Sequence, residues 1–234
     1  MGIDGERIRY TAKHTEILRA PKQNLHTFGT TNIYYYLVTE PVYSELINNI
    51  PETVVREGRV IAERPRIVTP YYLSGLEGFS LEARRYFEAL MKEHGSTAPG
   101  LFYSYKNEPK ETTIVSDDLP SVVDKLNTKI DKLGDPLAAI IKGDDALWDV
   151  SLMMFIYEVT RGSLQDNLRQ LGSRGLLGID TTGIPVDARV RIDEFFEKVT
   201  KGECEPSMLK DELDRWGLFE EYEDRFFNIF KKKQ

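Results

Sequence analysis

The pattern of apolar and polar residues changes character near residue 116. Before that point Tyr, Val, Ile and Thr recur in short runs, which fit the pleated, half-buried surface of a β-sheet. The clearest run is Thr31 to Thr39, with the sequence TNIYYYLVT. It stops before Pro41, because a proline ring restricts the backbone of the residue that precedes it. We therefore predict a strand over residues 31–39.

Two further apolar runs, 53–56 and 59–62, flank Glu57 and Gly58. A glycine supplies the positive φ that a tight turn requires, so this pattern predicts a β-hairpin with its turn at these two residues. Residues 67–69 are expected to continue the hairpin at an edge or a bulge, because the proline before them cannot donate a hydrogen bond to a neighbouring strand.

A second strand pair is predicted over residues 101–106 and 112–116, with a turn at 107–109. One helix is predicted between the two pairs. Ser80 is a good N-cap, Gly95 is a good stop, and apolar residues recur between them at helical spacing. This helix would cover one face of the sheet.

After residue 116 the pattern is helical. Asp117 and Asp118 precede Pro120, which is typical of a capped helix start, and Gly134 marks the end of that helix. A short apolar run follows over residues 136–141. The remaining helices are expected from the caps Asp144 and Asp145 to Gly162, from Ser163 to Leu171, from Asp187 to Lys201, and as a terminal pair around Leu209 and Phe226.

Together these elements predict an α+β fold. A small antiparallel β-sheet with its covering helix would occupy residues 1–116, and a helical bundle packed against it would occupy residues 117–234. No long linker rich in Pro, Gly or Ser separates the two halves, so a single compact domain is the alternative.

Charge is divided unevenly between the halves. The 234 residues include 31 Lys and Arg and 38 Asp and Glu, which gives a net charge of −7 at pH 7. A dedicated polyanion-binding protein usually carries the opposite sign. Residues 1–110 carry 14 basic and 13 acidic side chains, whereas residues 111–234 carry 17 and 25. If an anionic ligand binds, the N-terminal half is therefore the better candidate.

Several classes of protein find no support in the sequence. Cys204 is the single cysteine, which excludes an intramolecular disulfide and a multi-cysteine metal site. The signature motifs of dinucleotide-binding, phosphate-loop, kinase and hydrolase enzymes are absent, so we predict no catalytic class and no cofactor. The N-terminus lacks the apolar core of a signal peptide, and no apolar stretch approaches the roughly 20 residues that cross a bilayer. We expect a cytoplasmic protein that does not enter a membrane.

Two groups of residues could hold a metal ion. His14, Glu16 and His26 would supply two imidazoles and a carboxylate if the intervening proline turns the chain back. Asp145 and Asp149 would lie one turn apart on a helix, where two carboxylates can bind Mg²⁺. The structural alternatives are polar surface residues beside a proline turn and aspartates that cap a helix. A metal-assisted hydrolase is the third functional hypothesis.

Arginine and tyrosine side chains of the N-terminal half could form a surface for an anionic ligand. A sheet that presents both residue types can hold single-stranded nucleic acid or a nucleotide. Interleaved glutamates, such as Glu57 and Glu63, give the alternative that cross-strand pairs neutralise the arginines. The candidate residues are Arg7, Arg9, Arg64, Arg66, Tyr34 and Tyr36.

Residues 163–185 resemble part of a winged helix-turn-helix domain. The segment SLQDNLRQLGSRG would end the recognition helix, and the glycine turn after GLL would be the wing. The resemblance covers about residues 147–200 and departs from the family because its short second helix is missing. It implies that Asn167, Arg169 and Arg174 face a DNA groove, although the acidic surroundings favour contact with protein.

The C-terminal segment carries a broad apolar stripe, made of Leu218, Phe219, Tyr222, Phe226, Phe227, Ile229 and Phe230. Such a stripe packs on its own domain or forms an interface with a protein partner or a second copy. Recognisable surfaces without a reaction centre make a non-enzymatic binding or regulatory protein the leading hypothesis. Binding of nucleic acid or a nucleotide, through the N-terminal surface or the winged-helix-like segment, is the second.

Overall fold

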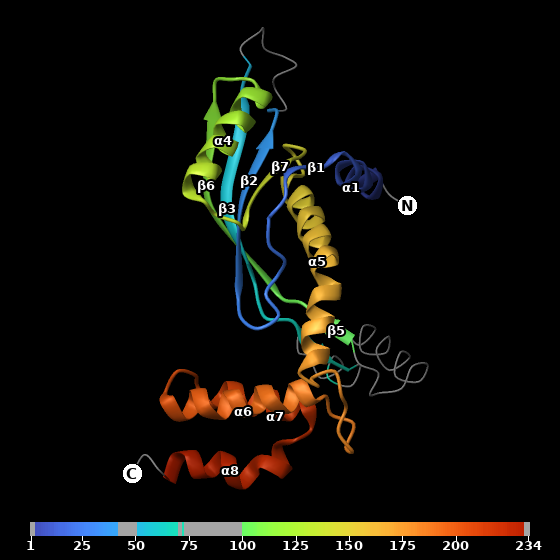
Figure 1. Ribbon diagram of the computed structural model, residues 1–234, viewed down its shortest axis with the longest axis vertical. Helices are drawn as coiled ribbons and strands as arrows, with labels where there is room; N and C mark the ends of the chain where they lie inside the picture. Colours follow the sequence, from blue (N-terminus) through green and yellow to red (C-terminus); the bar gives the residue numbers. More distant parts are fainter. Residues whose placement is uncertain (1–2, 42–50, 70–71, 73–99, 232–234) are drawn as a thin grey trace. The chain divides into compact units, whose positions relative to one another are not determined.

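The computed structural model describes residues 3–41, 51–69, 72 and 100–231 (Figure 1). Its strands and helices form an α+β fold, as predicted. The chain divides into two compact units. Unit 1 comprises Met1–Arg64 and Tyr103–Asn167, and unit 2 comprises Pro65–Phe102 and Leu168–Gln234. The units interleave along the sequence and do not follow the predicted boundary at residue 116.

Unit 1 is built on a five-stranded sheet with the strand order β1-β7-β2-β3-β6. The strands β2 and β7 are parallel and the other neighbours are antiparallel. The sheet is therefore mixed, whereas the prediction was a wholly antiparallel sheet. β7 arises from the short apolar run at 136–141, which is buried on both faces and therefore lacks alternation. The strands are β1 (Glu16–Arg19), β2 (Thr31–Thr39), β3 (Thr53–Ala62), β6 (Tyr105–Val115) and β7 (Ala138–Lys142).

Helices cover both faces of this sheet (Figure 1). The helix α4 (Leu119–Leu133) packs on the face that carries Tyr36 and Val38 of β2. The helix α5 (Trp148–Ser173) packs on the face that carries Tyr35 and Leu37. Successive strand residues point to opposite faces, so a single apolar strand supplies both cores. A further helix, α1 (Ile3–His14), precedes β1.

Gly58 lies inside a continuous strand, and the predicted hairpin is wrong. β3 runs unbroken through Glu57 and Gly58 and pairs with β2 over its whole length. Gly58 faces Tyr35 across the ladder, and a Cβ atom on Gly58 would lie 2.5 Å from Cζ and 2.8 Å from Cε1 of the Tyr35 ring. The glycine therefore makes room for a buried aromatic ring, which is the other common reason for glycine in a strand.

The predicted turn at 107–109 is also strand. These residues lie within β6, where Gly58 pairs with Pro109 and Glu57 pairs with Glu111, which leaves Lys110 as the extra residue of a bulge. β6 is an edge strand, and the sheet edge and the bulge are the two places where a proline is tolerated in a sheet.

The helix α5 continues through the predicted break at Gly162 and Ser163. The Ser163 hydroxyl does not cap a new helix. It donates to the Val159 carbonyl at 2.7 Å, one turn earlier, and accepts from the Leu25 amide at 2.9 Å. A serine bonded in this way is compatible with a helix interior.

The described part of unit 2 contains a two-stranded sheet, the end of α5 and the helices α6, α7 and α8. Residues 66–68 form β4 (Arg66–Val68), which pairs with β5 (Gly100–Phe102). The prediction that residues 67–69 continue the β2–β3 pair is therefore wrong. The helices are α6 (Val186–Lys201), α7 (Pro206–Trp216) and α8 (Phe219–Lys231), in agreement with the predicted positions. They surround a core that includes Ile192, Phe196, Val199, Leu209, Leu213, Trp216, Phe226 and Ile229.

Two further predictions concern the covering helix and the absence of a membrane-spanning segment. The helix predicted from Ser80 to Gly95 lies outside the described residues. Within the described ranges, no helix is both long enough and apolar enough to cross a membrane.

Candidate functional site

The two candidate tyrosines each lie beside a cation of the same chain. Tyr34 is exposed on β2 directly opposite Arg59 of β3. Tyr36 is buried, and the Lys129 ammonium of α4 lies 4.8 Å from its ring centroid. Tyr36 is therefore packed between the sheet and α4, whereas Tyr34 remains exposed beside a cation of the neighbouring strand.

The four candidate arginines occupy separate places. Arg7 and Arg9 are exposed on α1. The Arg64 guanidinium lies 5.6 Å from the Phe28 ring in unit 1. Arg66 belongs to unit 2, where it lies 5.5 Å from the Phe102 ring and donates to the Tyr72 hydroxyl at 3.2 Å. Arg64 and Arg66 therefore have aromatic partners in different units, and Arg7 and Arg9 lie on a different element from the tyrosines of β2.

The first metal candidate is not assembled. His14 Nδ1 lies 2.8 Å from the Tyr10 carbonyl oxygen, and its ring stacks on the Tyr10 ring. Glu16 forms an ion pair with Lys142 at 2.9 Å, and the His26 side chain is exposed. Across the ranges that the structure describes, no three His, Cys, Asp or Glu side chains are grouped to hold a metal ion.

The second metal candidate fails because Asp145 precedes α5 and is not one helical turn from Asp149. Asp145 Oδ1 accepts hydrogen bonds from Arg56 at 2.8 Å and from the Thr39 hydroxyl at 2.7 Å. Asp149 is exposed in the first turn of the helix. Asp144 is the capping residue, because its Oδ1 accepts from the Leu147 amide at 2.9 Å.

The implied recognition helix is absent as a separate element, because α5 begins at Trp148 and continues through residues 163–173 of the segment. Asn167 does not face a groove. It is fully buried, its amide donates to the Leu25 carbonyl at 2.9 Å and the Thr27 hydroxyl at 2.8 Å, and its oxygen accepts from Tyr103 at 2.8 Å. Arg169 and Arg174 are exposed. A turn at 180–183, closed by a bridge between Ile179 and Pro185, stands where the wing was predicted.

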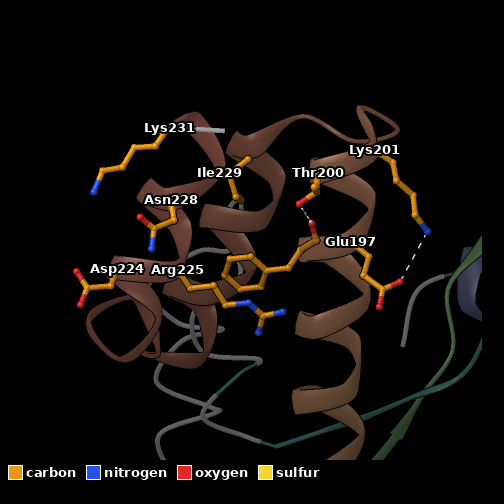
Figure 2. Close-up of a pocket in the computed structure, with 9 residues that line it drawn as sticks. Glu197, Thr200, Lys201, Asp224, Arg225, Asn228, Ile229 and Lys231 are labelled. Atoms are coloured by element: carbon orange, nitrogen blue, oxygen red, sulfur yellow. Dashed lines mark hydrogen bonds and ion pairs between the residues drawn. The ribbon is translucent and has the colours of Figure 1, made fainter. Parts of the chain in front are cut away.

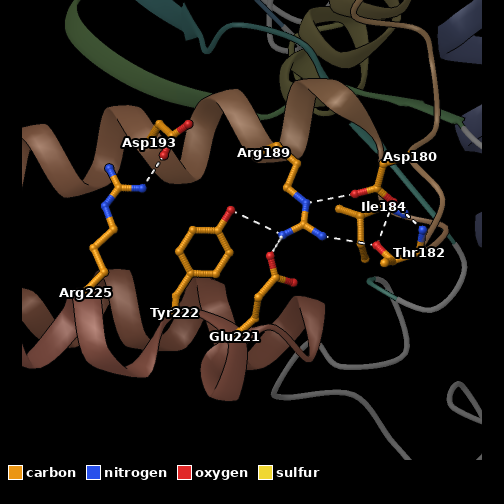
Figure 3. A network of polar contacts seen from close by, with 8 residues as sticks. All are labelled: Asp180, Thr182, Ile184, Arg189, Asp193, Glu221, Tyr222 and Arg225. Carbon is orange, nitrogen blue, oxygen red and sulfur yellow. Dashed lines mark hydrogen bonds and ion pairs between the residues drawn. The ribbon is translucent and has the colours of Figure 1, made fainter.

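The C-terminal helices of unit 2 are held in place by an arginine at the centre of a polar network (Figure 3). Arg189 of α6 donates through Nε to Asp180 Oδ2 at 2.9 Å and through Nη1 to Glu221 at 2.6 Å. Asp180 Oδ1 also accepts from the backbone amides of Thr182 at 2.8 Å and Ile184 at 2.9 Å. The network therefore fixes the start of α8 relative to α6 and the 180–184 turn.

Acid is expected to weaken this network through Asp180. Partial burial acts to raise the pKa of the Asp180 carboxyl, but the hydrogen bonds from Thr182, the Ile184 amide and Arg189 outweigh it and hold the pKa well below its ordinary value. A lowered native pKa contributes stability above the unfolded pKa, near 4, which is lost as the pH falls toward the native pKa.

Thermal unfolding of Asp180→Asn tests this expectation. The variant should unfold at a lower temperature than the wild type at pH 7, and the difference should narrow as the pH falls from about 4 to about 2. Asp211→Asn, at an exposed position of α7, is the matched control and should unfold near the wild type at pH 7. A difference that stays constant down to pH 2 would show that the carboxylate charge is not what stabilises the network.

A groove of about 850 Å³ lies between α6 and α8 (Figure 2). Phe196 and Ile229 supply its apolar surface, and Lys201 and Lys231 are among its polar lining residues. The Arg225 guanidinium lies 4.0 Å from the Phe196 ring centroid and forms an ion pair with Asp193. The Arg225 cation beside this apolar surface is therefore already paired within the chain.

The opposite flank of α8 carries a different arrangement, which we call the acid–aromatic row: Glu220, Glu223, Phe227 and Phe230. Their spacings of three, four and three residues place them in line along one side of the helix. Phe227 is 48% exposed and Phe230 is 45% exposed. Both rings rest against the buried Phe226, with centroids 5.7 Å away, so they are fixed in position while half of each ring faces solvent.

The row combines these rings with unpaired negative charge. Glu220 and Glu223 are exposed and form no ion pair with any residue in the described part of the chain. Asp224, one residue further on, is likewise exposed. The net charge of −7 adds a field of the same sign.

Five other aromatic rings in the described part of unit 2 differ from those of the row because each lies close to a cation of the chain itself. The distances from cation to ring centroid run from 4.0 Å to 6.0 Å. Phe227 and Phe230 have no such cation among the described residues. The pairs are Arg66 with Phe102, Lys198 with Phe195, Arg225 with Phe196, Lys210 with Phe219 and Arg189 with Tyr222.

The sequence indicated the apolar stripe of α8 but not which of its residues are buried and which are exposed. Phe226 and Ile229 are core residues of unit 2, whereas Phe227 and Phe230 project beside carboxylates. Helical spacing alone could have separated the two sets, since Glu220 and Glu223 recur on the same line as the exposed rings. Neither a family model, nor a curated protein, nor a solved structure matches the chain significantly.

Proposed function

We propose that this chain is a non-enzymatic interaction protein, and that the acid–aromatic row of α8 binds a basic segment of a partner protein in the cytoplasm. The observation that carries the proposal is the pair of half-exposed rings of Phe227 and Phe230, packed against Phe226, in line with the carboxylates of Glu220 and Glu223, which form no ion pair among the described residues. Exposed apolar surface with a polar border is typical of a protein-binding site.

Charge selects the kind of partner. A Lys or Arg side chain can place its cation over an aromatic ring and its donors on a neighbouring carboxylate, and both contacts are available along the row. The chain already uses this pairing within unit 2, where Lys210 lies 4.9 Å from the Phe219 ring and binds Asp214 at 2.6 Å. A nucleic acid is disfavoured, because its phosphates would meet the carboxylates of the row.

The row does not fit the same row of a second copy. A twofold interface brings the same surface patch of both copies together. In a parallel pairing Glu220 and Glu223 would lie against the same carboxylates of the other copy, which costs free energy. In an antiparallel pairing they would face Phe230 and Phe227 of the other copy and would gain no cation from the row. A basic segment supplies that cation and is therefore the better complement of the row.

Binding of a designed peptide tests the proposal. The probe is a fluorescein-labelled helical peptide with Lys and Arg at spacings of three and four and with leucines on the adjoining face, and its affinity is measured by fluorescence anisotropy. We expect micromolar binding to the full chain, because two rings and two carboxylates form a small site. Phe227→Ala/Phe230→Ala should weaken binding at least about tenfold, since hot-spot aromatic residues each contribute more than about 1 kcal/mol.

Leu133→Ala is the matched control, because Leu133 is an exposed apolar residue of α4 and lies outside the row. It should leave the affinity unchanged. Circular dichroism establishes that each variant retains its helices. Equal affinity of the wild type and the Phe227→Ala/Phe230→Ala variant, or equal loss in the Leu133→Ala control, would contradict the proposal.

A further inference from the structure

The helix α1 exposes positive charge that the rest of the described chain leaves unpaired. Of its side chains from residue 6 to residue 14, only Thr11 is buried. Arg7, Arg9 and Lys13 are exposed and form no ion pair with any residue that the structure describes, and Glu6 is the one acidic residue among them. A helix of 12 residues is marginally stable in water without tertiary contacts. A further contact on its basic side would therefore stabilise α1.

Arg9, Tyr10 and Lys13 share one side of α1. Lys13 lies four residues after Arg9 and three after Tyr10, and these spacings place side chains next to each other on a helix. The Tyr10 ring is 61% exposed and stacks on the His14 ring, with centroids 3.8 Å apart. This side of α1 combines aromatic surface with positive charge, whereas the acid–aromatic row of α8 combines it with negative charge.

We infer that α1 of a second copy of the chain is a basic segment that the acid–aromatic row binds. The inference rests on the proposed function of α8 and names a partner for that site. The cations of α1 bind the carboxylates of Glu220 and Glu223, and the Tyr10 ring lies against the exposed rings of Phe227 and Phe230. Both sets of charges lack partners among the described residues, so the contact breaks no ion pair that the structure shows.

This contact joins two different surfaces and is therefore heterologous. Each copy carries one α1 and one row, so each copy can bind a second copy and be bound by a third, and association continues along a chain or closes into a ring. One short helix on one side of α8 covers less than the roughly 800 Å² per partner of a standard interface. The association is therefore expected to be reversible, with a dissociation constant in the micromolar range, and to weaken as salt screens the charges.

Sedimentation velocity of the full chain from about 1 to 200 μM tests the inference, and circular dichroism establishes that each variant retains its helices. We expect the mean mass of the wild type to rise above that of a single chain within this range. Glu220→Lys/Glu223→Lys alone and Arg9→Glu/Lys13→Glu alone should each remain a single chain, because each brings like charges together. Lys132→Glu, at an exposed position of α4, is the control and should associate like the wild type.

An equimolar mixture of the two double variants is the sharpest arm of the experiment. The mixture should associate again, because the basic α1 of the first variant meets the acidic row of the second, and the acidic α1 of the second meets the basic row of the first. Net charge cannot account for this pattern. Glu220→Lys/Glu223→Lys makes the chain less negative, so general repulsion alone would make that variant associate more strongly than the wild type.

The outcomes separate this inference from the proposed function. A wild type that stays a single chain up to 200 μM, a double variant that associates like the wild type, or a mixture that associates no more than its components would overturn the inference. A single-chain wild type that binds the designed basic peptide would leave the proposed function standing, whereas a chain that binds no basic peptide would overturn both. Tighter peptide binding by Arg9→Glu/Lys13→Glu at single-chain mass would place α1 on the row of its own chain and would also overturn the inference.

Discussion

Replacing Gly58 by valine is expected to lower the free energy of unfolding by about 3 kcal/mol, the upper part of the usual cost of overpacking a core. A Cβ at residue 58 would overlap the buried ring of Tyr35, and Tyr35 is only 1% exposed. The ring cannot swing away without losing the hydrogen bond from its hydroxyl to Asn107 Oδ1 at 3.0 Å. Urea unfolding followed by circular dichroism measures the change.

Gly162→Ala is the matched control for this substitution. Gly162 lies on the exposed face of α5, and a Cβ there would meet nothing within 4 Å. Because alanine favours a helix over glycine by about 1 kcal/mol, this variant should be as stable as the wild type or more so. Replacing the Tyr35 ring by a smaller side chain, in the double variant Gly58→Val/Tyr35→Leu, should recover part of the lost stability. A Gly58→Val protein as stable as the wild type would contradict the packing of Tyr35 across β3.

Asn167→Leu is expected to cost about 3 kcal/mol of stability, because one side chain satisfies three buried groups. The Leu25 carbonyl and the Thr27 hydroxyl would lose the amide that donates to them, and the Tyr103 hydroxyl would lose its acceptor. Burying a polar group without a partner costs about 1–3 kcal/mol. Leucine has nearly the same size, so the change tests hydrogen bonding more than volume.

The matched control is Gln165→Leu, two residues earlier on the same helix and exposed. It should change stability by less than about 0.5 kcal/mol, as surface substitutions usually do. Hydrogen exchange should also show faster exchange of the Leu25 amide in Asn167→Leu, since this segment is held to α5 through Asn167 and Ser163. An Asn167→Leu protein with wild-type stability would favour an exposed role for Asn167.

The burial of Tyr103 also affects the pKa of its hydroxyl group. Burial raises the pKa of the Tyr103 hydroxyl to about 12, with a smaller contribution from the neighbouring Tyr105. The hydroxyl therefore remains a hydrogen-bond donor to Asn167 well above neutral pH, and the contact between α5 and the start of β6 does not depend on pH in the ordinary range.

The sequence predicted elements best where one strong local signal stood alone. The run of β-branched and aromatic residues at 31–39 and the cap residues of 118–134 each led to the observed element, because strand propensity and helix capping are local properties. Gly58 and Gly162 were misinterpreted because glycine has several roles. Only the residue across the ladder, Tyr35, shows that Gly58 makes room for a ring instead of turning the chain.

Tertiary pairing explains the other differences. β7 joins β2 from more than a hundred residues away, so nothing in its own five residues distinguishes a central strand from a short helix. The candidate surfaces were likewise decided by the tertiary structure and not by the local sequence. The N-terminal arginines were grouped by composition, but the fold gives Arg64 and Arg66 aromatic partners in different units. The stripe of α8 was visible as a pattern, and the structure divides it into core and exposed rings along the line that helical spacing marks.

The most direct test of the central claim is a comparison of three peptides with the same leucines, whose charged positions are Lys and Arg, Gln, or Glu. Anisotropy titrations with the full chain and with Glu220→Lys/Glu223→Lys measure all six affinities. The account predicts that the wild type prefers the basic peptide over the acidic one by at least about tenfold, that added salt narrows this preference, and that the variant reverses it. Equal affinity for the three peptides, or a preference that Glu220→Lys/Glu223→Lys leaves unchanged, would contradict it.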